Sequence, residues 1–564
     1  MKGRWAGFQI SLWMVVLCTA IFGFLNFGVA EEAVPRKLTL MVYICGSNLE
    51  SQNGLASDDI KEMITSGVDD REVNILVMTG GSSDWRIHWG TGNNTILEIG
   101  NQKLRAVWPS NREERDIALN MGDASTLAFF LQYGATNYPA EDYALILWDH
   151  GGGPMNGVCF DELFSKKNTQ DSLDLSELRT ALSDSPFDSG NPLEWIGFDA
   201  CLMSSAETAF ICAPFAKYMI ASQETEPGTG WDYSFLKRAS EGLRGDEMGK
   251  LIIESYMDDS HASELMLTLS CIDLSQMGNV EAATDSLFNN IITILTSECY
   301  SEISNSRRNA KSYGRASTAS EYDLVDLFSL AEQFSSLATD SVNDLETALE
   351  NAIVYNDGNQ ENSHGLSLYY PYYNKVDYQK NWGEQYSKWG FSDGYKDFIT
   401  HYANIWLGEQ LADWTNLRAI ALPPLHDSQE FTLQLTHQQE DNYAFAQLLI
   451  LGRMGSSEPY YYKVEEIDDI QMDKDRILHA DYDYKALYVV DDKGKPRCGP
   501  IPYEIVEGYY MIRANLSDIT WGTYLDDYFS VRNEKKEISM HAKKGIPPMC
   551  PKLCRRWFGC YRCH

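Results

Sequence analysis

The sequence predicts an α/β protein in which a mostly parallel sheet, flanked by helices, precedes a smaller β-sandwich-like domain. Two observations lead to this prediction. Between residues 36 and 410, short apolar runs suited to buried strands alternate with segments of helical composition, which is typical of a parallel sheet covered on both faces. Between residues 420 and 535 the pattern changes to short alternating runs, which are typical of a β-sandwich.

The first strand–helix–strand unit lies near the start of this region. Leu38–Ile44 and Val73–Met78 are apolar runs rich in β-forming residues. Ala56–Ile64, between them, has helix composition, with Ser57 and Asp58 as capping candidates. The sequence therefore predicts two parallel strands joined by a helix.

The same unit recurs three times further along the chain. Each time a helical segment leads into an apolar strand: Ala124–Tyr133 into Tyr143–Trp148, Leu175–Leu182 into Trp195–Phe198, and Leu202–Phe215 into Tyr218–Ala221. Because parallel strands end at one edge of a sheet, residues that follow these strands are expected to gather there.

The remainder of residues 36–410 is predicted to be mainly helical. Residues 235–262 and 275–355 have helical composition, with the apolar run Met266–Ile272 predicted as a strand between them. Leu366–Tyr370 is predicted as one further strand of the sheet, and Trp382–Leu411 as an aromatic-rich helical segment.

Cys201 is the first candidate catalytic residue. It lies between the strand run Trp195–Phe198 and the helical run Leu202–Phe210. At such a position the positive end of the helix dipole would favour the thiolate, which is the nucleophilic form of cysteine. The alternative is a buried structural cysteine, which is common for this residue type.

His150 is the second candidate, and it follows the strand run Tyr143–Trp148. Three glycines come directly after it, so the backbone there can approach a substrate closely. His150 lies 51 residues before Cys201, which is the order and spacing of the catalytic pair of caspases. The pattern predicts a dyad in which the thiolate attacks the scissile carbonyl and the histidine transfers protons. No third member stands out, and the alternative is a histidine of the core.

Five stretches resemble motifs of the clostripain family of cysteine peptidases, which have a caspase-like fold. WDHGGG at 148–153 and GFDACLMSSAE at 197–207 are similar to the family's histidine and cysteine motifs. MVYICGSNLE at 41–50, ASQETEPGTGWDY at 221–233 and HGLSLYYP at 364–371 fit the same family. The resemblance covers roughly residues 36–410 and implies a cysteine endopeptidase.

The resemblance also implies roles for residues around the dyad. By the caspase-like analogy, the backbone N–H groups of Gly151 and Cys201 would form the oxyanion hole. Asp199 shares a strand face with Cys201 and matches an aspartate that the family places in the pocket for Arg or Lys. The alternative for Asp199 is a hydrogen-bonded carboxylate at the end of a strand.

The loop 221–233 departs from the pattern of some basic-specific relatives. Those relatives carry a second acid between two glycines, where this chain has the neutral Thr229. Glu224, Glu226 and Asp232 flank it, so a preference for basic substrates is retained in a weaker form. We include Glu224, Glu226 and Thr229 among the candidates for substrate binding.

The segment 161–171, between the two catalytic residues, is a candidate for self-cleavage. It is polar and contains the pair Lys166 and Lys167, and from Ser165 it shows no apolar periodicity, so it is expected to be an exposed loop. The resemblance implies that relatives are processed in this interval. The alternative is an ordinary solvated loop.

The N-terminus predicts export. Lys2 and Arg4 precede the apolar run Phe8–Val29, and the small residues 28–30 suit a cleavage site, so residues 1–30 are interpreted as a signal peptide. The alternative is an uncleaved membrane anchor. The net charge of −35 makes nucleic acid an unsuitable partner. Protein or peptide substrates with basic residues are the expected partners.

The tail 541–564 is basic and carries Cys550, Cys554, Cys560 and Cys563. Their spacing leaves disulfides, a zinc site and free thiols open, and export favours disulfides. The acidic run 465–475 lacks the glycine and the final glutamate of an EF-hand loop. No cofactor is therefore required, although the family resemblance keeps calcium possible.

Two other functions remain open at this point. One is a catalytically inactive binding protein that retains the fold and acts through its β-rich domain. The other is a thiol hydrolase that acts on an ester or amide other than a peptide. An intact pair of Cys201 and His150 favours the endopeptidase.

Overall fold

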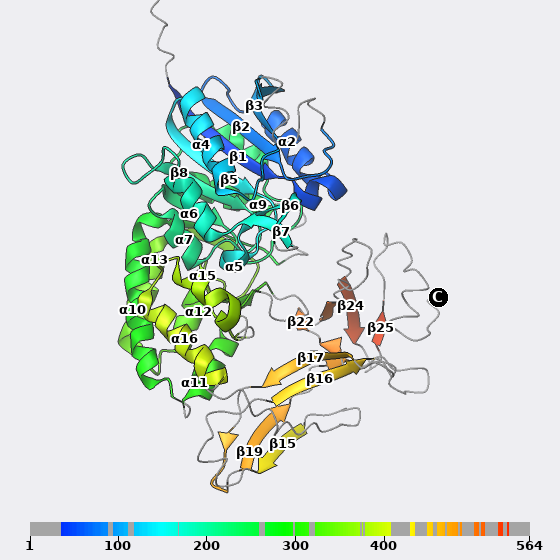
Figure 1. Cartoon of the computed structure of the whole chain (residues 1–564), viewed down its shortest axis with the longest axis vertical. Coiled ribbons are helices and arrows are strands. Elements are labelled where there is room, and N and C mark those ends of the chain that lie inside the picture. Colours follow the sequence, from blue (N-terminus) through cyan, green and yellow to red (C-terminus); the bar gives the residue numbers. More distant parts are fainter. Residues whose placement is uncertain are drawn as a thin grey trace, which may run out of the picture.

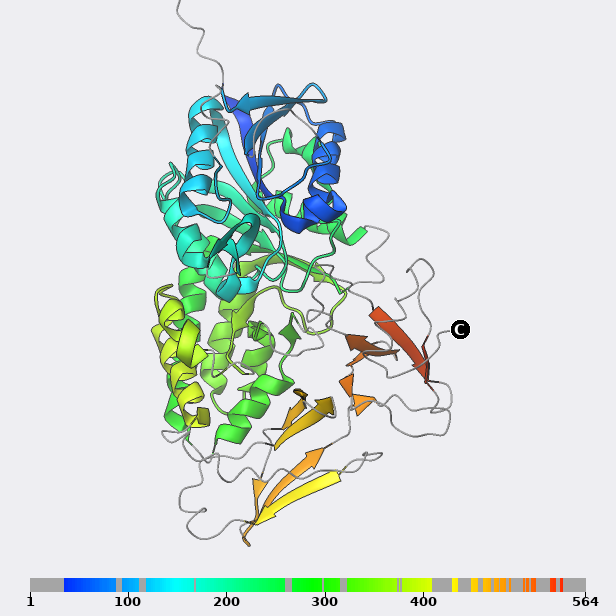
Figure 2. The ribbon, with the colours of Figure 1, turned by 45° about the vertical axis from the view of Figure 1, so that its right-hand side comes forward.

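The computed structural model describes residues 35–87, 94–110, 118–166, 169–258, 266–296, 299–314, 322–372, 375 and 378–407, together with strands between 429 and 540. Figures 1 and 2 show an upper sheet with its helices, a helical region against its lower part, and the later strands to one side. The signal peptide and the cysteine-rich tail predicted from the sequence lie outside the described residues.

A nine-stranded sheet, in the order β13-β10-β9-β8-β5-β1-β2-β3-β4, forms the centre of the molecule. The five strands in the middle run parallel: β1 (Arg36–Cys45), β2 (Val73–Gly80), β5 (Ala140–Trp148), β8 (Leu193–Asp199) and β9 (Ala216–Ala221). The outer strands are antiparallel: β3 (Thr95–Gly100), β4 (Lys103–Trp108), β10 (Thr268–Asp273) and β13 (Ile353–Gly358). The predicted, mostly parallel sheet is confirmed.

Helices cover both faces because the buried strands present apolar side chains alternately to each. From β1, Met41 and Tyr43 join the core on one face, while Leu40 and Val42 join the core on the other. The first face carries α4 (Ala124–Asn137), α6 (Leu175–Ser183) and α7 (Ala206–Cys212). The second carries α2 (Leu55–Thr65), α8 (Leu236–Ala239) and α9 (Gly245–Asp258). Figure 1 shows α4 and α2 on opposite sides of the sheet.

The helical region after the sheet is largely as predicted, with one correction. Its main helices are α10 (Met277–Ile294), α11 (Tyr300–Asn309), α12 (Leu327–Gln333), α13 (Thr339–Ala352), α15 (Gly383–Ser387) and α16 (Asp393–Leu407). The prediction that Leu366–Tyr370 joins the main sheet is wrong. It forms β14 (Ser367–Tyr369) of a separate antiparallel sheet with β11 (Ser312–Tyr313) and β12 (Leu324–Asp326). Both edges of the main sheet already end in antiparallel strands, so this segment pairs locally instead.

Short elements complete this part of the chain. They are η2 (Leu49–Asn53), α5 (Gly153–Asn156), η3 (Tyr233–Phe235), η5 (Leu274–Gln276) and η6 (Tyr378–Trp382). A hairpin of β6 (Val158–Lys166) and β7 (Thr169–Leu173) replaces the loop expected at 161–171. A two-stranded hairpin can be formed by a polar sequence that has no helical periodicity. The sequence of segment 161–171 therefore predicts a loop, where the structure has a hairpin.

The strands after residue 429 form small antiparallel sheets, in agreement with the predicted β-rich region. They are β15 (Gln429–Gln434), β16 (Leu448–Met454), β17 (Tyr460–Ile467), β18 (Gln471–Met472), β19 (Ile477–Tyr482), β20 (Ala486–Leu487), β21 (Ile501–Pro502), β22 (Glu504–Val506), β23 (Tyr509–Arg513), β24 (Tyr528–Asn533) and β25 (Ile538–Met540). Their pairing into one sandwich, and the domain boundaries, stay predictions. Within the described residues, no helix has the length and apolar character needed to cross a bilayer.

Candidate active site

Cys201 lies in a turn just beyond the carboxyl end of β8, and not at the start of a helix. The helix expected from Leu202 begins only at Ala206, where the Ser205 hydroxyl caps it by accepting a hydrogen bond from the N–H of Thr208 at 3.1 Å. Leu202 has φ of 66°, a left-handed conformation that helices do not contain. The predicted dipole effect on the thiol is therefore wrong, because a tight turn separates the two.

The turn at Cys201 is held by the segment that follows β9. The N–H of Leu202 donates to the carbonyl of Glu224 at 3.1 Å, and the N–H of Ser204 donates to the carbonyl of Ser222 at 2.8 Å. These bonds satisfy the backbone of the turn and compensate for the strained conformation of Leu202. Cys201, the candidate nucleophile, is thus held in a turn that is fixed by tertiary hydrogen bonds.

The sulfur of Cys201 is a neutral thiol in this environment. Its Sγ accepts a hydrogen bond from the N–H of Glu226 at 3.2 Å and lies 3.8 Å from the carbonyl oxygen of the same residue. Burial, followed by the charge of Glu226, raises the pKa of the thiol to about 12, although the N–H groups of Glu226 and Gly151 act in the opposite direction. A nucleophilic role for Cys201 would therefore require a nearby base that takes the thiol proton.

His150 follows β5, the strand next to β8 in the sheet. Its Nε2 lies 2.7 Å from Oδ1 of Asn48, and burial lowers the pKa of the imidazole, which favours the neutral form. A neutral imidazole is the form that can accept a proton from a thiol. The structure thus offers a neutral thiol and a neutral base on adjacent strand ends.

Gly151 brings the turns of His150 and Cys201 into contact. A Cβ atom at position 151 would lie 1.9 Å from the carbonyl oxygen of Cys201, so only glycine allows this approach. The N–H of Gly151 also acts on the Cys201 thiol. The N–H of Gly151, one of the two groups predicted for the oxyanion hole, therefore lies beside the sulfur, and the oxyanion hole itself stays a prediction.

Asp149, directly before His150, ties its turn to two other segments. It is buried, and its carboxylate accepts hydrogen bonds from the Ser47 hydroxyl and from the N–H of Phe160, both at 2.5 Å. Burial raises the pKa of this carboxyl well above its usual value. Asp149 is a structural clamp on the histidine turn.

Asp199 lies at the end of β8 in a buried cluster of acids. Its carboxylate accepts hydrogen bonds from the Tyr233 hydroxyl at 2.9 Å and from the N–H of Trp231 at 3.4 Å. Burial raises the pKa of Asp199 to about 7. A Cβ at Gly230 would lie 2.8 Å from Oδ1 of Asp199, so the following loop closes tightly over the carboxylate.

Glu226 lies beside Asp199, and no cation accompanies either side chain among the described residues. The Glu226 carboxyl oxygens are both buried, and neither makes a hydrogen bond of normal geometry, although Asp199 and the Trp231 indole are close enough to act on them. Burial and the charge of Asp199 raise the pKa of Glu226 well above its usual value. Asp59 on α2 adds a third buried carboxyl, which accepts a hydrogen bond from the Trp148 indole at 2.6 Å.

The other two candidates on this loop differ from Glu226. Oε1 of Glu224 accepts hydrogen bonds from the N–H groups of Thr225, at 2.8 Å, and Gly314, at 3.2 Å. Glu224 therefore supports the loop with its carboxylate. Thr229 is exposed at the tip of the loop. Of the three, the structure brings only Glu226 into contact with both the nucleophile and the buried acids.

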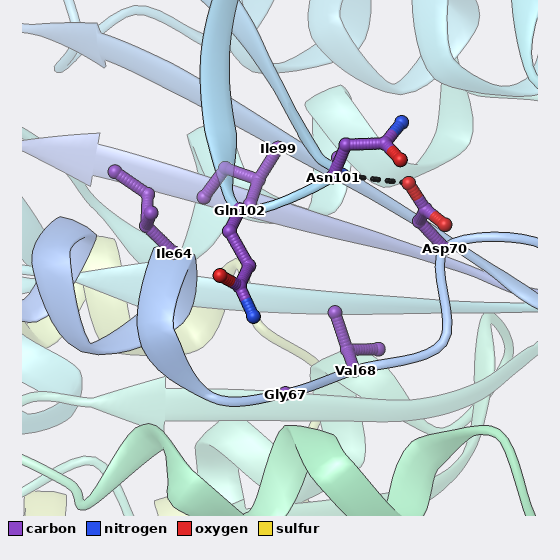
Figure 3. Close-up of a pocket in the computed structure, with 8 residues that line it drawn as sticks. Ile64, Gly67, Val68, Asp70, Ile99, Asn101 and Gln102 are labelled. Atoms are coloured by element: carbon purple, nitrogen blue, oxygen red, sulfur yellow. Dashed lines mark hydrogen bonds between the residues drawn. The ribbon is translucent and has the colours of Figure 1, made fainter.

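The described residues contain no metal-binding cluster, and the hollow whose lining residues Figure 3 shows lies apart from this site. Within the described part of the chain, no group of three or more His, Cys, Asp or Glu side chains could hold a metal ion. The hollow, of about 290 Å³, is present elsewhere in the described part of the chain. Figure 3 shows residues that line it, such as Val68, Asp70 and Gln102. It lies where β2 begins and β3 ends, at the sheet edge opposite Cys201.

Comparison with known proteins identifies the family. The model of the clostripain family matches residues 42–406, which is well over half of the chain. The chain belongs to the clostripain family. It is therefore a cysteine endopeptidase that acts on protein or peptide substrates.

The individual relatives that we compare with this chain share little sequence identity with it. Clostripain of Hathewaya histolytica is 25% identical over 408 residues, which cover 60% of this chain and 75% of the relative. A secreted C11 cysteine protease from Bacteroides thetaiotaomicron, solved with an irreversible peptide inhibitor, is 20% identical with a TM-score of 0.47, covering 63% of this chain and 99% of that one. An inactive zymogen C11 protease from Parabacteroides distasonis is 20% identical with a TM-score of 0.48, covering 65% and 99%.

Sequence reasoning missed Asn48 and two of the acids near Asp199, which are Asp59 and Glu62. Asn48 lies in the motif 41–50, which the resemblance had marked, and it follows β1, the other neighbour of β5. The signal that could have found Asn48 is its position after β1, a strand that lies beside β5 in the sheet. Asp59 and Glu62 lie on α2 and act on Asp199 only through the fold, so no local pattern marks them.

Proposed function

We propose that this clostripain-family protein is an exported endopeptidase that cuts after Arg or Lys through the dyad of Cys201 and His150. One observation carries the proposal. The turns of the dyad meet beside two buried carboxyls, Asp199 and Glu226, that have no cation in the described structure. Such a pair is suited to a guanidinium or ammonium group supplied by a substrate.

The reaction begins from the neutral pair. Sγ of Cys201 attacks the scissile carbonyl carbon while the thiol proton passes to His150, and the carbonyl oxygen becomes an oxyanion. The N–H groups of Gly151 and Cys201 stabilise that oxyanion. The His150 imidazolium then gives its proton to the leaving amine, and a thioester remains on Cys201.

Water completes the reaction. The water oxygen attacks the thioester carbonyl carbon while His150 takes one proton from the water. The tetrahedral intermediate then collapses. The C–S bond breaks, a carboxylic acid leaves, and the proton returns to the sulfur. No oxidant, reductant or metal enters this sequence, so we propose that the enzyme requires no cofactor, with calcium binding elsewhere left to experiment.

Selectivity arises from the cost of leaving the two carboxyls unpaired. Without a cation, burial and mutual repulsion favour protonation of Asp199 and Glu226. A basic side chain beside the carboxyls reverses this preference and gains charge-assisted hydrogen bonds. An apolar or acidic side chain gains nothing there, so the preference for basic residues follows.

The test is a panel of fluorogenic peptides that differ only in the residue before the cut. Wild type is expected to cleave the Arg and Lys peptides and to leave the Asp and Leu peptides intact. The Asp199→Asn variant should lose at least about tenfold in kcat/KM on the basic peptides, since a charge-assisted pair contributes more than 1.4 kcal/mol. The matched control is Asp232→Asn, an acid of the same loop whose carboxylate caps the N–H of Ser234.

Two outcomes would contradict the proposal. Equal cleavage of Asp or Leu peptides would place the selectivity elsewhere. Hydrolysis of an ester substrate with no cleavage of any peptide would favour the non-peptidase thiol hydrolase.

We also propose export and self-processing. Export is supported by Lys2, Arg4 and the apolar run Phe8–Val29, and one similar solved structure is described as a secreted protease. N-terminal sequencing of protein from the culture medium should begin near Glu31, whereas protein that stays in the membrane would indicate an uncleaved anchor. Self-processing would occur at Lys166, which ends β6, or at Lys167, which lies outside the described residues.

A further inference from the structure

Asn48 holds the catalytic histidine by a side-chain contact. Its Oδ1 lies 2.7 Å from Nε2 of His150, within the range of a good hydrogen bond. Asn48 follows β1, and His150 follows β5, which pairs with β1 in parallel register up to Ile44 and Trp148. The two side chains therefore project from neighbouring strand ends that the sheet keeps fixed.

The contact between Asn48 and His150 is braced by a second bond between the same two turns. The Ser47 hydroxyl donates to Asp149 at 2.5 Å, one residue before each partner of the first pair. Ser47 is itself fixed, because its carbonyl accepts a hydrogen bond from the Ser82 hydroxyl at 2.9 Å. Ser47 and Asn48 of one turn thus bind Asp149 and His150 of the other. The position of Asn48 is therefore fixed by two adjacent side-chain contacts.

The chemistry of an amide oxygen determines which nitrogen of His150 carries the proton. An oxygen only accepts hydrogen bonds, so Nε2 of His150 must donate and therefore bears the proton. The lone pair of the neutral ring then lies on Nδ1. We propose that Asn48 is a positioning residue, which selects the Nε2–H tautomer of His150 and leaves Nδ1 to accept the thiol proton of Cys201. This inference rests on the proposed dyad.

Asn48 also acts when His150 becomes charged. The bond from Nε2–H to a neutral oxygen strengthens when the ring turns into an imidazolium, so it stabilises the charged state. The titratable groups that face the histidine turn or its immediate neighbours include Asp149, Asp161, Cys45, Cys159, Cys201, Glu224 and Glu226. Burial raises the pKa of these groups and lowers that of His150, so the shift of the acid limb between wild type and each Asn48 variant, and not its absolute position, reports the histidine.

Two substitutions separate positioning from a merely structural role. Asn48→Leu keeps the size of the side chain and removes the acceptor. Asn48→Asp keeps the acceptor and adds a negative charge, and position 48 is only half-buried, so the charge can be accommodated. The matched control is Ser51→Ala in η2, whose hydroxyl donates to Glu162 and not to His150. Thermal unfolding of each variant shows whether it folds.

The expected results have opposite signs for the two variants. Asn48→Leu should lower kcat by about tenfold to a hundredfold with little change in KM, because proton transfer by a held base contributes on the order of 10²–10⁴. The acid limb of the pH dependence of kcat in this variant should move to lower pH, because the imidazolium loses a hydrogen-bond partner and the pKa of His150 falls. Asn48→Asp should keep most of its kcat and move the acid limb to higher pH. Unchanged kcat in Asn48→Leu, or shifts of the same sign in both variants, would overturn the proposal.

A second measurement keeps this test independent of peptide selectivity. Alkylation of Cys201 by iodoacetamide, followed by peptide mass spectrometry, needs only the thiol and the base. Near neutral pH, labelling should be slower in Asn48→Leu and faster in Asn48→Asp than in wild type, by about tenfold for each unit of pKa change. If wild type cuts no basic peptide but labelling follows this order, the proposed selectivity fails and the role of Asn48 stands. Equal labelling in all three proteins refutes the role of Asn48 alone.

Discussion

Replacing Asp199 by asparagine should make the folded protein more stable above neutral pH. The carboxyl is buried at the end of β8, and burial raises its pKa from 3.8 to about 7. Because this acid has a higher pKa folded than unfolded, the folded state holds the extra proton between those two values. The free energy of unfolding therefore falls as pH rises through this window. Above about pH 7 the protein bears the full cost of burying an ionised Asp199.

The magnitude follows from the size of the shift. A rise from 3.8 to about 7 corresponds to ~4 kcal/mol, at about 1.4 kcal/mol per unit. Asparagine keeps the hydrogen bonds with Tyr233 and Trp231 only in part, which costs about 1–2 kcal/mol. The expected net gain above neutral pH is about 2–3 kcal/mol, and near the pKa of the unfolded acid it should give way to a net loss of about 1–2 kcal/mol, because only the weakened hydrogen bonds remain.

Urea unfolding of Asp199→Asn measures this gain, in a Cys201→Ala background that prevents self-digestion. The comparison is made at about pH 4.5 and about pH 8.5, on either side of the window. Asp232→Asn should change stability little at either pH, because its carboxylate is only partly buried. A gain of equal size at both pH values, or a loss at the higher one, would refute the reasoning that a buried ionised carboxylate destabilises the fold.

Other predictions test the chemistry directly. Cys201→Ala should lower peptide hydrolysis by several orders of magnitude with unchanged circular dichroism, since no other group replaces the covalent step; residual activity above a few per cent would contradict this. KM for an Arg peptide should fall as pH rises through about 7, where Asp199 ionises, and Glu226→Gln should flatten that dependence in a pH-resolved assay. Lys166→Ala combined with Lys167→Ala should abolish a nick seen on denaturing gels of wild type but not of Cys201→Ala; a nick shared by both would exclude self-processing. EDTA should leave initial rates unchanged, and a loss restored by calcium would reveal a cation site.

The sequence predicts the sheet well because its buried strands are continuous apolar runs. It also places Cys201 and His150 correctly after β8 and β5, since parallel strands share one carboxyl edge. The start of α7 is missed because Leu202–Ser205 has helical composition, while the bonds to Ser222 and Glu224 hold it as a turn. Tertiary hydrogen bonds of this kind override local propensity.

The state of the thiol could not be predicted for a similar reason. A local pattern suggests a thiolate, whereas burial and the charge of Glu226 raise the pKa of Cys201 to about 12. Glu226 lies 25 residues away in sequence, and its effect depends on how the loop after β9 folds back. Asn48 likewise reaches His150 across 102 residues, which no local pattern encodes.

The bonds between the nucleophile turn and β14 limit how the chain can be divided. The carbonyl of Ser204 accepts hydrogen bonds from the N–H of Ser367, at 2.9 Å, and from its hydroxyl, at 2.8 Å. A recombinant fragment that ends after β10 would contain Cys201, His150 and Asn48, yet it would lack the strand that anchors the turn. The smallest active unit must therefore extend past Ser367, and circular permutants or split reporters should be opened elsewhere. Conversely, a small molecule that separates Ser204 from Ser367 would disable the enzyme without entering the substrate site.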